Sequence, residues 1–462
     1  MIQLRPAGAA DALSSARPVR YFTSGDLMPE PRAVEQLRRL AEVPGLDQHI
    51  AVLPDVHYKS RNPTPTGTVI VSRDVLLPRA VDDGHNCGMR MIGVGLPASE
   101  LGPGVLDELF RKLIEAIPIT AHESPLLSED QCERLLTHGP SVLCGAIGMP
   151  AAELDRIENR GTMTPALDPD EILTVVRPKA IRKGNGWLGT IGGGNHFLEL
   201  QEIVEILDPP AAGLLGLVPG ETVFMLHTDS RRLGKQVLRP LREEAAAVAG
   251  ATAGDDLWTV SADTELGRRL VAGMAAATHA GYANRSAVTH LVRRTVRSVI
   301  GDAALELPLI YDCGHESIQK ERHNGRWLWV HRHGASRALP ASSVAHDPVL
   351  GRIGQPVPIP GSMGADSFIG VAQAGTADTF HSVAHGAGRI VEKAVAAGQY
   401  DAAQVEREME REGIRLYRYG TDEIAGQAPA SFKSAARVVD VMSALNLVRP
   451  VVRLRPIAVL KG

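Results

Sequence analysis

The chain has 462 residues, of which 44% are hydrophobic and 22% charged, and its formal net charge is −4 with the histidines neutral. These values are ordinary for a folded soluble protein that buries a sizeable core. The small negative charge excludes recognition of nucleic acid by bulk charge alone, so any such site must be a local basic groove.

The four cysteines, Cys87, Cys132, Cys144 and Cys313, lack the paired spacing of a zinc ribbon and do not indicate a disulfide framework. A reducing compartment fits this pattern best. Residues 1–22 hold no uninterrupted apolar segment, and no run of 18 apolar residues occurs anywhere in the chain. We therefore expect a cytoplasmic protein without an export signal or a membrane span.

The first part of the chain alternates short apolar runs with proline and glycine, which predicts buried strands at 50–56, 67–72 and 91–97. Helical spacing of apolar residues predicts a helix over 104–117. The next stretch has helix candidates near 129–136 and 169–174 and almost no candidate catalytic residues. We interpret residues 101–182 as a helical subdomain inserted into a single domain that spans 1–462.

The second part of the chain mixes strands and helices. Residues 186–206 predict a strand, a glycine loop and a second strand. Further strands are predicted at 221–230, 306–315 and 451–462. Helices are predicted at 235–300, 388–398 and 403–412. Residues 350–370 are rich in glycine and proline and predict loop and short strand. This mixture is compatible with an α/β (α+β) fold, although periodicity alone does not give its topology.

Five of the 16 histidines lie at the ends of apolar strands or against glycines. They are His196, His227, His315, His333 and His385. A single histidine in such a place is more often a hydrogen-bonded structural residue. Five of them together with Cys87 favour a functional site, since ligands and catalytic groups gather at strand ends in α/β folds.

Residues 82–88, Asp-Asp-Gly-His-Asn-Cys-Gly, offer carboxylate, imidazole and thiolate ligands within one short segment. A thiolate such as that of Cys87 can bridge two metal ions because sulfur is polarisable and has several lone pairs. The structural alternative is an acidic turn with a buried cysteine.

Two further segments suit phosphate. Gly192, Gly193 and Gly194 precede Asn195 and His196, so backbone N–H groups can form an anion nest next to a side-chain donor and a metal ligand. A flexible turn is the alternative. In residues 227–232, Arg231 or Arg232 can pair with phosphate. The basic segment 331–337 is of a kind that tracks a nucleic-acid backbone, or else is a solvated loop.

Residues 385–389, His-Gly-Ala-Gly-Arg, are expected to open the helix at 388–398. Glycines at a helix N-terminus expose N–H groups, and the helix dipole favours anions there. The neutral imidazole of His385 can attack phosphorus and form a phosphoramidate, if pyrophosphate leaves and metals neutralise the phosphoryl charge. A structural capping histidine is the alternative.

Taken together, these motifs resemble the RtcB RNA ligase family, in the family's order and from residue 54 to the last residue. The segments are PDVH (54–57), NCGMR (86–90), GGGNHFLEL (192–200), HTDSRRLG (227–234), HRHGASRA (331–338), PGSMG (360–364), HGAGR (385–389) and LRPIAVLKG (454–462). The resemblance implies one RtcB-like catalytic domain of mixed β-sheets packed together, with surrounding helices and a helical insertion.

The resemblance also implies residue roles. His385 matches the histidine that GTP guanylylates, and Cys87 the thiolate that bridges two manganese ions. His227 with a carboxylate would complete one metal site, and His196 with His315 the other. The implied metal ligands are Asp83, Cys87, His196, His227 and His315. The implied nucleotide contacts are Asn195, His196, Phe197, Leu198, Glu199, His315, Glu316, Pro360, Gly361, Ser362, Met363, Ser367, His385, Gly386, Ala387, Gly388 and Lys461. Glu199 is expected to contact the guanine edge.

The implied activity joins RNA ends that carry a 3′-phosphate or 2′,3′-cyclic phosphate to ends that carry a 5′-hydroxyl, as in RNA repair and tRNA processing, by a monomeric enzyme. Manganese is implied by the family only, because affinity order alone favours zinc at a Cys/His site. Two alternatives stay open. One is a metal-dependent phosphohydrolase or nuclease, which would not need His385. The other is a non-catalytic relative that binds nucleotide or RNA.

The chain departs from the family pattern at several positions. Gly84 stands where the family has the metal-binding aspartate, so Asp83, Asp82 or His85 is expected to replace it. The other departures are Asp229 and Arg232 for glycines, Glu316 for asparagine, His333 for lysine and Phe432 for tyrosine. The carboxylates of Asp229 and Glu316 would repel phosphate unless a metal or an arginine lies between. We infer a divergent branch whose substrate need not be tRNA halves.

Overall fold

The computed structural model describes residues 16–251, 256–420 and 424–462. The first fifteen residues, on which part of the expectation of no export signal rests, lie outside the described residues, and so do four residues of the predicted helical stretch 235–300. Across the described ranges, no helix combines the length and the apolar character that crossing a membrane requires.

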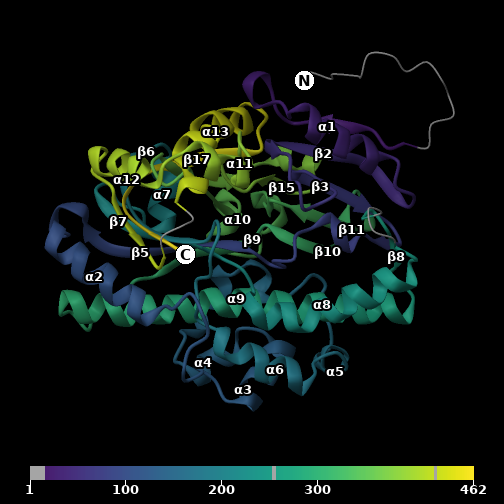
Figure 1. Cartoon of the computed structure of the whole chain (residues 1–462), viewed down its shortest axis with the longest axis horizontal. Helices are drawn as coiled ribbons and strands as arrows, with labels where there is room; N and C mark the ends of the chain where they lie inside the picture. Colours follow the sequence, from purple (N-terminus) through teal and green to yellow (C-terminus); the bar gives the residue numbers. More distant parts are fainter. Residues whose placement is uncertain (1–15, 252–255, 421–423) are drawn as a thin grey trace.

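Two main β-sheets lie above a pair of long helices in Figure 1. The larger sheet follows the path β13-β14-β17-β6-β7-β5-β9, and β16 pairs with β17 off this path. In that order its strands are Pro356–Ile359, Ser367–Ala372, Val448–Lys461, Phe197–Ile206, Glu221–Thr228, Gly88–Pro97 and Leu309–Gly314, with β16 at Arg415–Arg418. Alternate residues of β7 enter different apolar clusters on its two faces. A strand covered on both faces forms a continuous apolar run, as residues 223–226 do.

The smaller sheet runs in the order β1-β2-β3-β11-β10. Its strands are Val19–Tyr21, Leu46–His57, Thr66–Ser72, Arg326–His333 and Glu316–His323. One apolar cluster joins Val69 and Val330 of this sheet to Val357 and Phe368 of the larger sheet. His315 alone separates β9 from β10 and therefore links the two sheets. These observations confirm an α/β fold of mixed sheets packed together.

Two short ribbons complete the strands of the described residues. β12 (Ala335–Arg337) pairs with β15 (Ser382–Ala384), and β4 (Val75–Leu76) pairs with β8 (Val260–Ser261). The first ribbon carries the chain from the smaller sheet into the segment that begins with His385.

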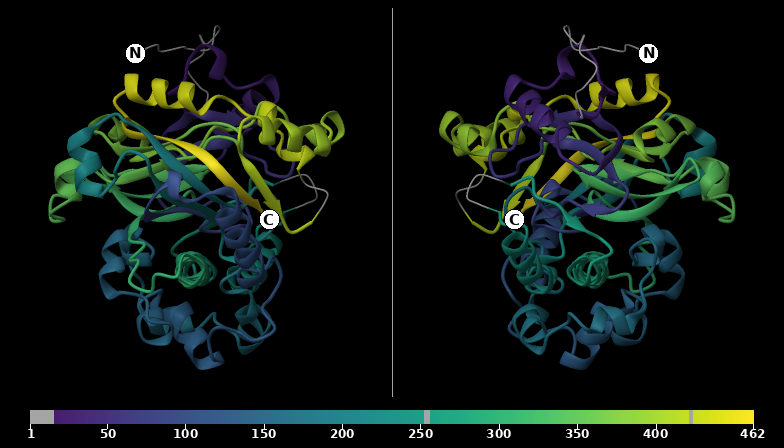
Figure 2. Two further views of the ribbon diagram at one scale, coloured as in Figure 1. Left: turned by 90° about the vertical axis from the view of Figure 1, so that its left-hand side faces the viewer. Right: turned by 90° about the vertical axis from the view of Figure 1, so that its right-hand side faces the viewer.

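The long helices are α8 (Arg231–Val248) and α9 (Glu265–Ile300), and Figure 2 shows them between the sheets and a group of shorter helices. α9 has 36 residues and is therefore about 54 Å long. The group beneath comprises α3 (Glu129–His138), α4 (Val142–Ala146), α5 (Pro169–Leu173) and α6 (Pro178–Gly184). These helices share one apolar core with α8 and α9. Their treatment as a subdomain inserted over 101–182 stays a prediction.

The remaining helices of the described chain surround the sheets (Figure 1). They are α1 (Pro31–Ala41), α2 (Pro103–Ala116), α7 (Pro209–Leu215), α10 (Leu350–Ile353), α11 (Lys393–Gln399), α12 (Ala402–Arg411) and α13 (Ala435–Ala444). The helices predicted at 104–117, 129–136, 169–174 and 403–412 are thus confirmed to within a few residues. The strands predicted at 50–56, 67–72, 91–97, 221–230, 306–315 and 451–462 are confirmed as β2, β3, β5, β7, β9 and β17.

Four expectations about local structure are wrong. The helical stretch predicted at 235–300 is divided into α8 and α9, with β8 between them. Residues 186–191 form no strand, and α10 adds a short helix within 350–370. The helix expected from residue 388 begins only at Lys393. The reason is Gly388, whose φ of +74° is not helical and whose added Cβ would meet the carbonyl oxygen of Asp55 at 2.3 Å. Residues 385–389 therefore form a loop against β2, and the anion-binding argument from a helix terminus does not apply.

Candidate functional site

The candidate site lies at one edge of the larger sheet, where three neighbouring strands begin or end. Gly88, the first residue of β5, pairs with Thr228 at the end of β7 and with Gly314 at the end of β9. This register places Cys87, His227 and His315 side by side. His196 joins them because Phe197 of β6 pairs with His227.

The four side chains are buried and their donor atoms are close together. The Cys87 Sγ atom lies 3.2 Å from the Nε2 atom of His227 and 3.5 Å from that of His196. The Nε2 atoms of His227 and His315 are 3.2 Å apart. The Nδ1–H of His227 donates to the carbonyl oxygen of Asn195 at 3.0 Å, which leaves its Nε2 lone pair facing Cys87.

This donor set fits a divalent cation. Burial lowers the pKa of His196 to about 4 and those of His227 and His315 well below their usual value, so the rings are neutral ligands. Burial raises the pKa of the Cys87 thiol, so a cation is needed to hold the thiolate. Within the described chain, the Nδ1 atoms of His196 and His315 have no hydrogen-bond partner although both are buried. Cys87, His227 and His315 together could hold one metal ion.

These ligands do not group as the resemblance implied. Cys87, His227 and His315 form one group of donor atoms, whereas His196 approaches Cys87 at 3.5 Å outside that group. The reason is the β5–β7–β9 register, which aligns Cys87 with the ends of both β7 and β9.

A network of buried charged residues lies next to the backbone of the site. Asp312 of β9 binds Arg90 at 2.9 Å and Arg285 of α9 at 2.7 Å, and all three side chains are fully buried. Arg285 also donates to the carbonyl oxygens of Asn86 and Thr228, at 2.8 and 3.1 Å. These carbonyls belong to the residues next to Cys87 and His227, so Arg285 fixes the backbone that carries both ligands.

His385 follows β15 and stands beside this cluster, with its ring centroid 4.7 Å from that of His315. Its Nδ1–H donates to the Oδ2 atom of Asp55 at 2.7 Å and to the carbonyl oxygen of Gly334 at 2.8 Å. The same Asp55 oxygen accepts the backbone N–H of His385 at 3.1 Å. With the proton held on Nδ1, the lone pair of Nε2 is free for nucleophilic attack.

A cavity adjoins His385 and contains most of the expected nucleotide contacts. Those that line it are Asn195, Phe197, Glu199, Pro360, Gly361, Ser362, Met363, Gly386, Ala387, Gly388 and Lys461. Leu198 does not, since alternate residues of β6 face opposite ways and Leu198 enters the apolar core. The lining also lacks His196, His315, Glu316 and Ser367. The Ser367 Oγ accepts the N–H of Gly361, which does line the cavity, at 3.0 Å.

Sequence reasoning did not select several residues at this cavity. His57, Met89, Arg389, Gln427 and Phe432 line it too. Three lay inside quoted motifs, since His57 ends PDVH, Met89 belongs to NCGMR and Arg389 ends HGAGR. Gln427 is held near Gly194, whose carbonyl oxygen accepts from its side chain at 3.2 Å, and no local pattern in the sequence marks it.

Glu199 lies near the start of β6, and its carboxylate lines the cavity. Burial raises its pKa to about 7, although the nearby charge of Lys461 acts in the other direction. Its Oε2 atom accepts from the side chain of Gln201 at 2.6 Å. A deprotonated Glu199 can accept hydrogen bonds from a purine edge that carries N–H donors.

A family model described as "tRNA-splicing ligase RtcB" matches residues 36–462. The chain belongs to the RtcB family. A curated relative from Thermococcus kodakarensis, named tRNA-splicing ligase RtcB, is 32% identical over 463 residues, which cover 96% of this chain and 95% of the relative. The RNA-splicing ligase RtcB of Mycobacterium tuberculosis is 32% identical over 441 residues, covering 92% and 100%. The tRNA-splicing ligase RtcB of Pyrococcus furiosus is 34% identical over 395 residues, which cover 82% of this chain and 40% of the relative.

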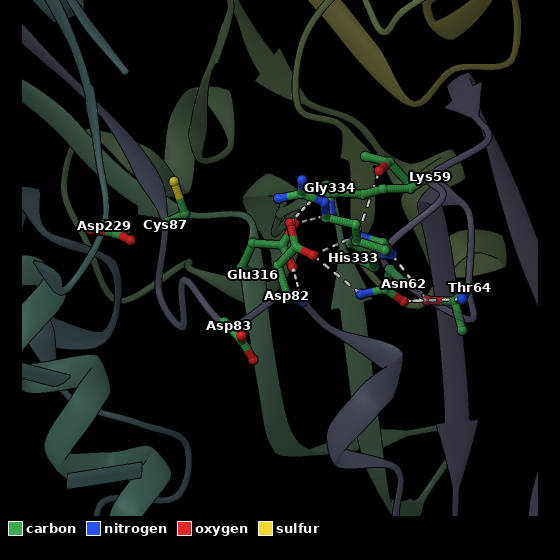
Figure 3. Close-up of polar contacts among 12 residues, drawn as sticks. Lys59, Asn62, Thr64, Asp82, Asp83, Cys87, Asp229, Glu316, His333 and Gly334 are labelled. Carbon is green, nitrogen blue, oxygen red and sulfur yellow. Dashed lines mark hydrogen bonds and ion pairs between the residues drawn. The ribbon is translucent and has the colours of Figure 1, made fainter. Parts of the chain in front are cut away.

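This RtcB-family chain brings none of the three expected substitutes for the aspartate at position 84 together with Cys87. The Asp83 side chain is 75% exposed and pairs with Arg242 at 3.1 Å, and Figure 3 shows it directed away from Cys87. Asp82 pairs with Lys59 and accepts from Asn62. His85 is buried against Thr278 of α9, 3.1 Å from its hydroxyl.

Asp82, Glu316 and His333 form a second group whose geometry is compatible with a metal ion. Its polar atoms already have partners in the fold, as Figure 3 shows. Glu316 accepts the backbone N–H groups of Asp82 and Gly334, at 3.1 and 2.8 Å, and His333 is 3.0 Å from the Thr64 hydroxyl. Burial raises the pKa of Glu316 to about 8, so it is mainly neutral at pH 7 and does not repel phosphate.

One expectation about basic residues in this RtcB-family chain is wrong. In the segment 331–337, Arg332 is fully buried and bound to Glu321, so the segment is interior strand and does not track a nucleic-acid backbone. Arg231 binds Asp229 at 3.0 Å, whereas Arg232 is exposed, so a pairing of Arg231 or Arg232 with phosphate stays a prediction. Arg231 also explains Gly192, whose φ is +83° and whose added Cβ would lie 2.1 Å from the guanidinium.

Proposed function

We propose that this protein is a GTP- and manganese-dependent RNA ligase. It joins RNA ends that carry a 3′-phosphate or a 2′,3′-cyclic phosphate to RNA ends that carry a 5′-hydroxyl. The observation that carries the proposal is the state of His385, whose Nδ1 is held by Asp55 and Gly334 while its Nε2 is available between the cavity and the Cys/His cluster.

In the first step, the Nε2 lone pair of His385 attacks the α-phosphorus of GTP. A P–N bond forms, the bond to the β-phosphate oxygen breaks, and pyrophosphate leaves. The imidazole gains positive charge as this bond forms, and the carboxylate of Asp55 at 2.7 Å stabilises that charge. Asp55 thereby acts as a positioning residue for the nucleophile.

In the second step, an oxygen of the RNA 3′-phosphate attacks the guanylyl phosphorus. The P–N bond breaks, and the electron pair returns to Nε2 of His385. The 5′-hydroxyl of the other RNA end then attacks the activated 3′-phosphate, GMP leaves, and the hydroxyl proton passes to solvent. A 2′,3′-cyclic phosphate is first opened by water to the 3′-phosphate.

Cys87, His196, His227 and His315 would hold the divalent cations, which we propose to be two manganese ions. When bound, such ions neutralise charge on the phosphoryl oxygens. The choice of manganese rests on the family resemblance, because the ligands alone would favour zinc. Glu199 would bind the guanine edge and Lys461, which also lines the cavity, would lie near the nucleotide. We further propose a monomer acting in the cytoplasm, in keeping with four cysteines that form no disulfide.

The test is to incubate the purified protein with manganese and α-labelled GTP and to look for acid-labile label on the protein. We expect label on the wild type and none on His385→Ala. The exposed His138 of α3 provides a matched control, and His138→Ala should label like the wild type. Label that persists on His385→Ala would refute the nucleophile.

Ligation is tested separately, with one RNA that ends in a 3′-phosphate and another that begins with a 5′-hydroxyl. Joined product from the wild type and none from His385→Ala is expected. A protein that takes up label but joins nothing would show that another acceptor receives the nucleotide. Cleavage of RNA that persists in His385→Ala would favour the metal-dependent nuclease instead.

A further inference from the structure

Asp229 follows β7 and fills the space next to Gly84. A Cβ atom added to Gly84 would lie 3.0 Å from the Oδ2 atom of Asp229 and 3.5 Å from its Cβ. A side chain at position 84 would therefore project into the volume that the Asp229 carboxylate now occupies. The two backbones meet here because Gly88 and Thr228 are paired in the β5–β7 ladder.

The Asp229 carboxylate belongs to the surroundings of Cys87 and His196. It is buried, with 4% of its side chain exposed. Its negative charge acts on both residues: it adds to the burial that raises the pKa of the Cys87 thiol, and it partly opposes the burial that lowers the pKa of the His196 ring. Figure 3 shows the carboxylate on the side of Cys87, whereas Asp83 is directed away. The buried Nδ1 atom of His196 has no partner among the described residues.

Of the two carboxylate oxygens of Asp229, one has a partner that a cation can replace. Its Oδ1 atom accepts the backbone N–H of Arg231 at 2.8 Å and the guanidinium at 3.0 Å. Its Oδ2 atom pairs with Lys235 at 3.2 Å, and the Lys235 side chain is 42% exposed. An ion pair with an exposed lysine is weak, so a divalent cation can displace it.

We propose that Asp229 supplies the carboxylate ligand of the metal site built on Cys87 and His196, in the place that Gly84 leaves open. In this proposal, positions 84 and 229 have exchanged a glycine and an aspartate, and the Oδ2 atom of Asp229 lies 3.0 Å from the place that a Cβ atom at position 84 would take. The inference rests on the proposed function only in that it assumes a pair of cations. It assigns a ligand that none of Asp82, Asp83 and His85 provides.

The test is calorimetric titration of the metal-free full-length protein with manganese chloride. Wild type should bind two ions. Asp229→Asn keeps an oxygen that can accept the Arg231 N–H, so it should fold, and we expect its weaker site to lose affinity by at least about tenfold, as for changes next to a metal site. Asp83→Asn is the matched control and should bind two ions like the wild type.

The decisive variant is the exchange Gly84→Asp with Asp229→Gly, which should restore the second site. Gly84→Asp alone should lower the melting temperature, since the new side chain meets Asp229. Unchanged manganese affinity in Asp229→Asn would overturn the inference, and so would a folded double variant that binds one ion. A wild type that binds two ions but takes up no label from GTP would refute the proposed function and leave this inference standing.

Discussion

Replacing Asp55 by asparagine isolates the role of the carboxylate behind His385. The asparagine oxygen can still accept the Nδ1–H and the backbone N–H of His385, while its NH₂ group takes the place of Oδ1, which has no partner among the described residues. The variant thus keeps the geometry and loses the charge. A hydrogen bond to a charged group contributes about 1.5–3 kcal/mol and a neutral one about 0.5–1.5 kcal/mol, a difference of about 1–1.5 kcal/mol.

That difference corresponds to about a tenfold slower formation of the P–N bond. Asp55→Ala removes both hydrogen bonds and leaves only the Gly334 carbonyl on Nδ1, so we expect a loss of about a hundredfold or more. The assay is single-turnover labelling with α-labelled GTP across a range of nucleotide concentrations. The maximal rate should fall while the half-saturating concentration stays nearly constant, because the charge on the ring develops only in the transition state.

His385→Ala sets the floor for these measurements, and thermal melts confirm that each variant is folded. Asp55→Asn that labels as fast as the wild type would refute a role for the carboxylate charge. Asp55→Asn that is as inactive as His385→Ala would show that the aspartate does more than hold and stabilise the ring.

Two further predictions concern buried charges. GTP affinity should fall about tenfold for each pH unit below 7, because the pKa of Glu199 is about 7 and a proton on the carboxylate competes with guanine N–H donors. Calorimetry between pH 8 and pH 5.5 measures this affinity. A flat pH profile of the wild type would contradict the prediction, and so would the same pH profile in Glu199→Gln. Asp312→Asn should lower the free energy of unfolding by about 3–5 kcal/mol, since two buried guanidinium groups lose their counter-charge. Urea denaturation measures this, with the exposed Asp107→Asn as a control that should change little, and an equal loss in both would contradict it.

The part of the fold that the sequence predicts well is the part governed by local pattern. The strand at 221–230 and the helix at 104–117 are confirmed. The spacing of apolar residues distinguishes a strand that is buried on both faces from a helix that is buried on one. The helix expected from residue 388 failed for a non-local reason. Gly388 packs against the Asp55 carbonyl of β2, a contact that no neighbouring residue encodes.

The metal-ligating residues of the candidate site could be predicted from the sequence, but the residues that hydrogen-bond to them or to His385 could be predicted only in part. Cys87, His196, His227 and His315 are distinguished by their places at strand ends, and the structure brings them together. Asp55 was not selected as a site residue, although it lies in the quoted segment PDVH, because nothing near it in the sequence marks its partner. Its position under His385 depends on a contact between distant parts of the chain.

The proposed exchange of residues at positions 84 and 229 shows why the metal ligands could not be assigned before the pairing of the strands was known. Read along the chain, Gly84 removes a carboxylate and its neighbours Asp82 and Asp83 are the obvious replacements. The backbone excludes both, because β5 begins at Gly88 and the turn before it directs Asp83 to solvent and Asp82 to Lys59. Once Gly88 is paired with Thr228, the residue after Thr228 becomes the nearest carboxylate to the gap. A departure that looks like the loss of a metal ligand in one segment is therefore best interpreted together with the gain of a carboxylate in the strand that pairs with it.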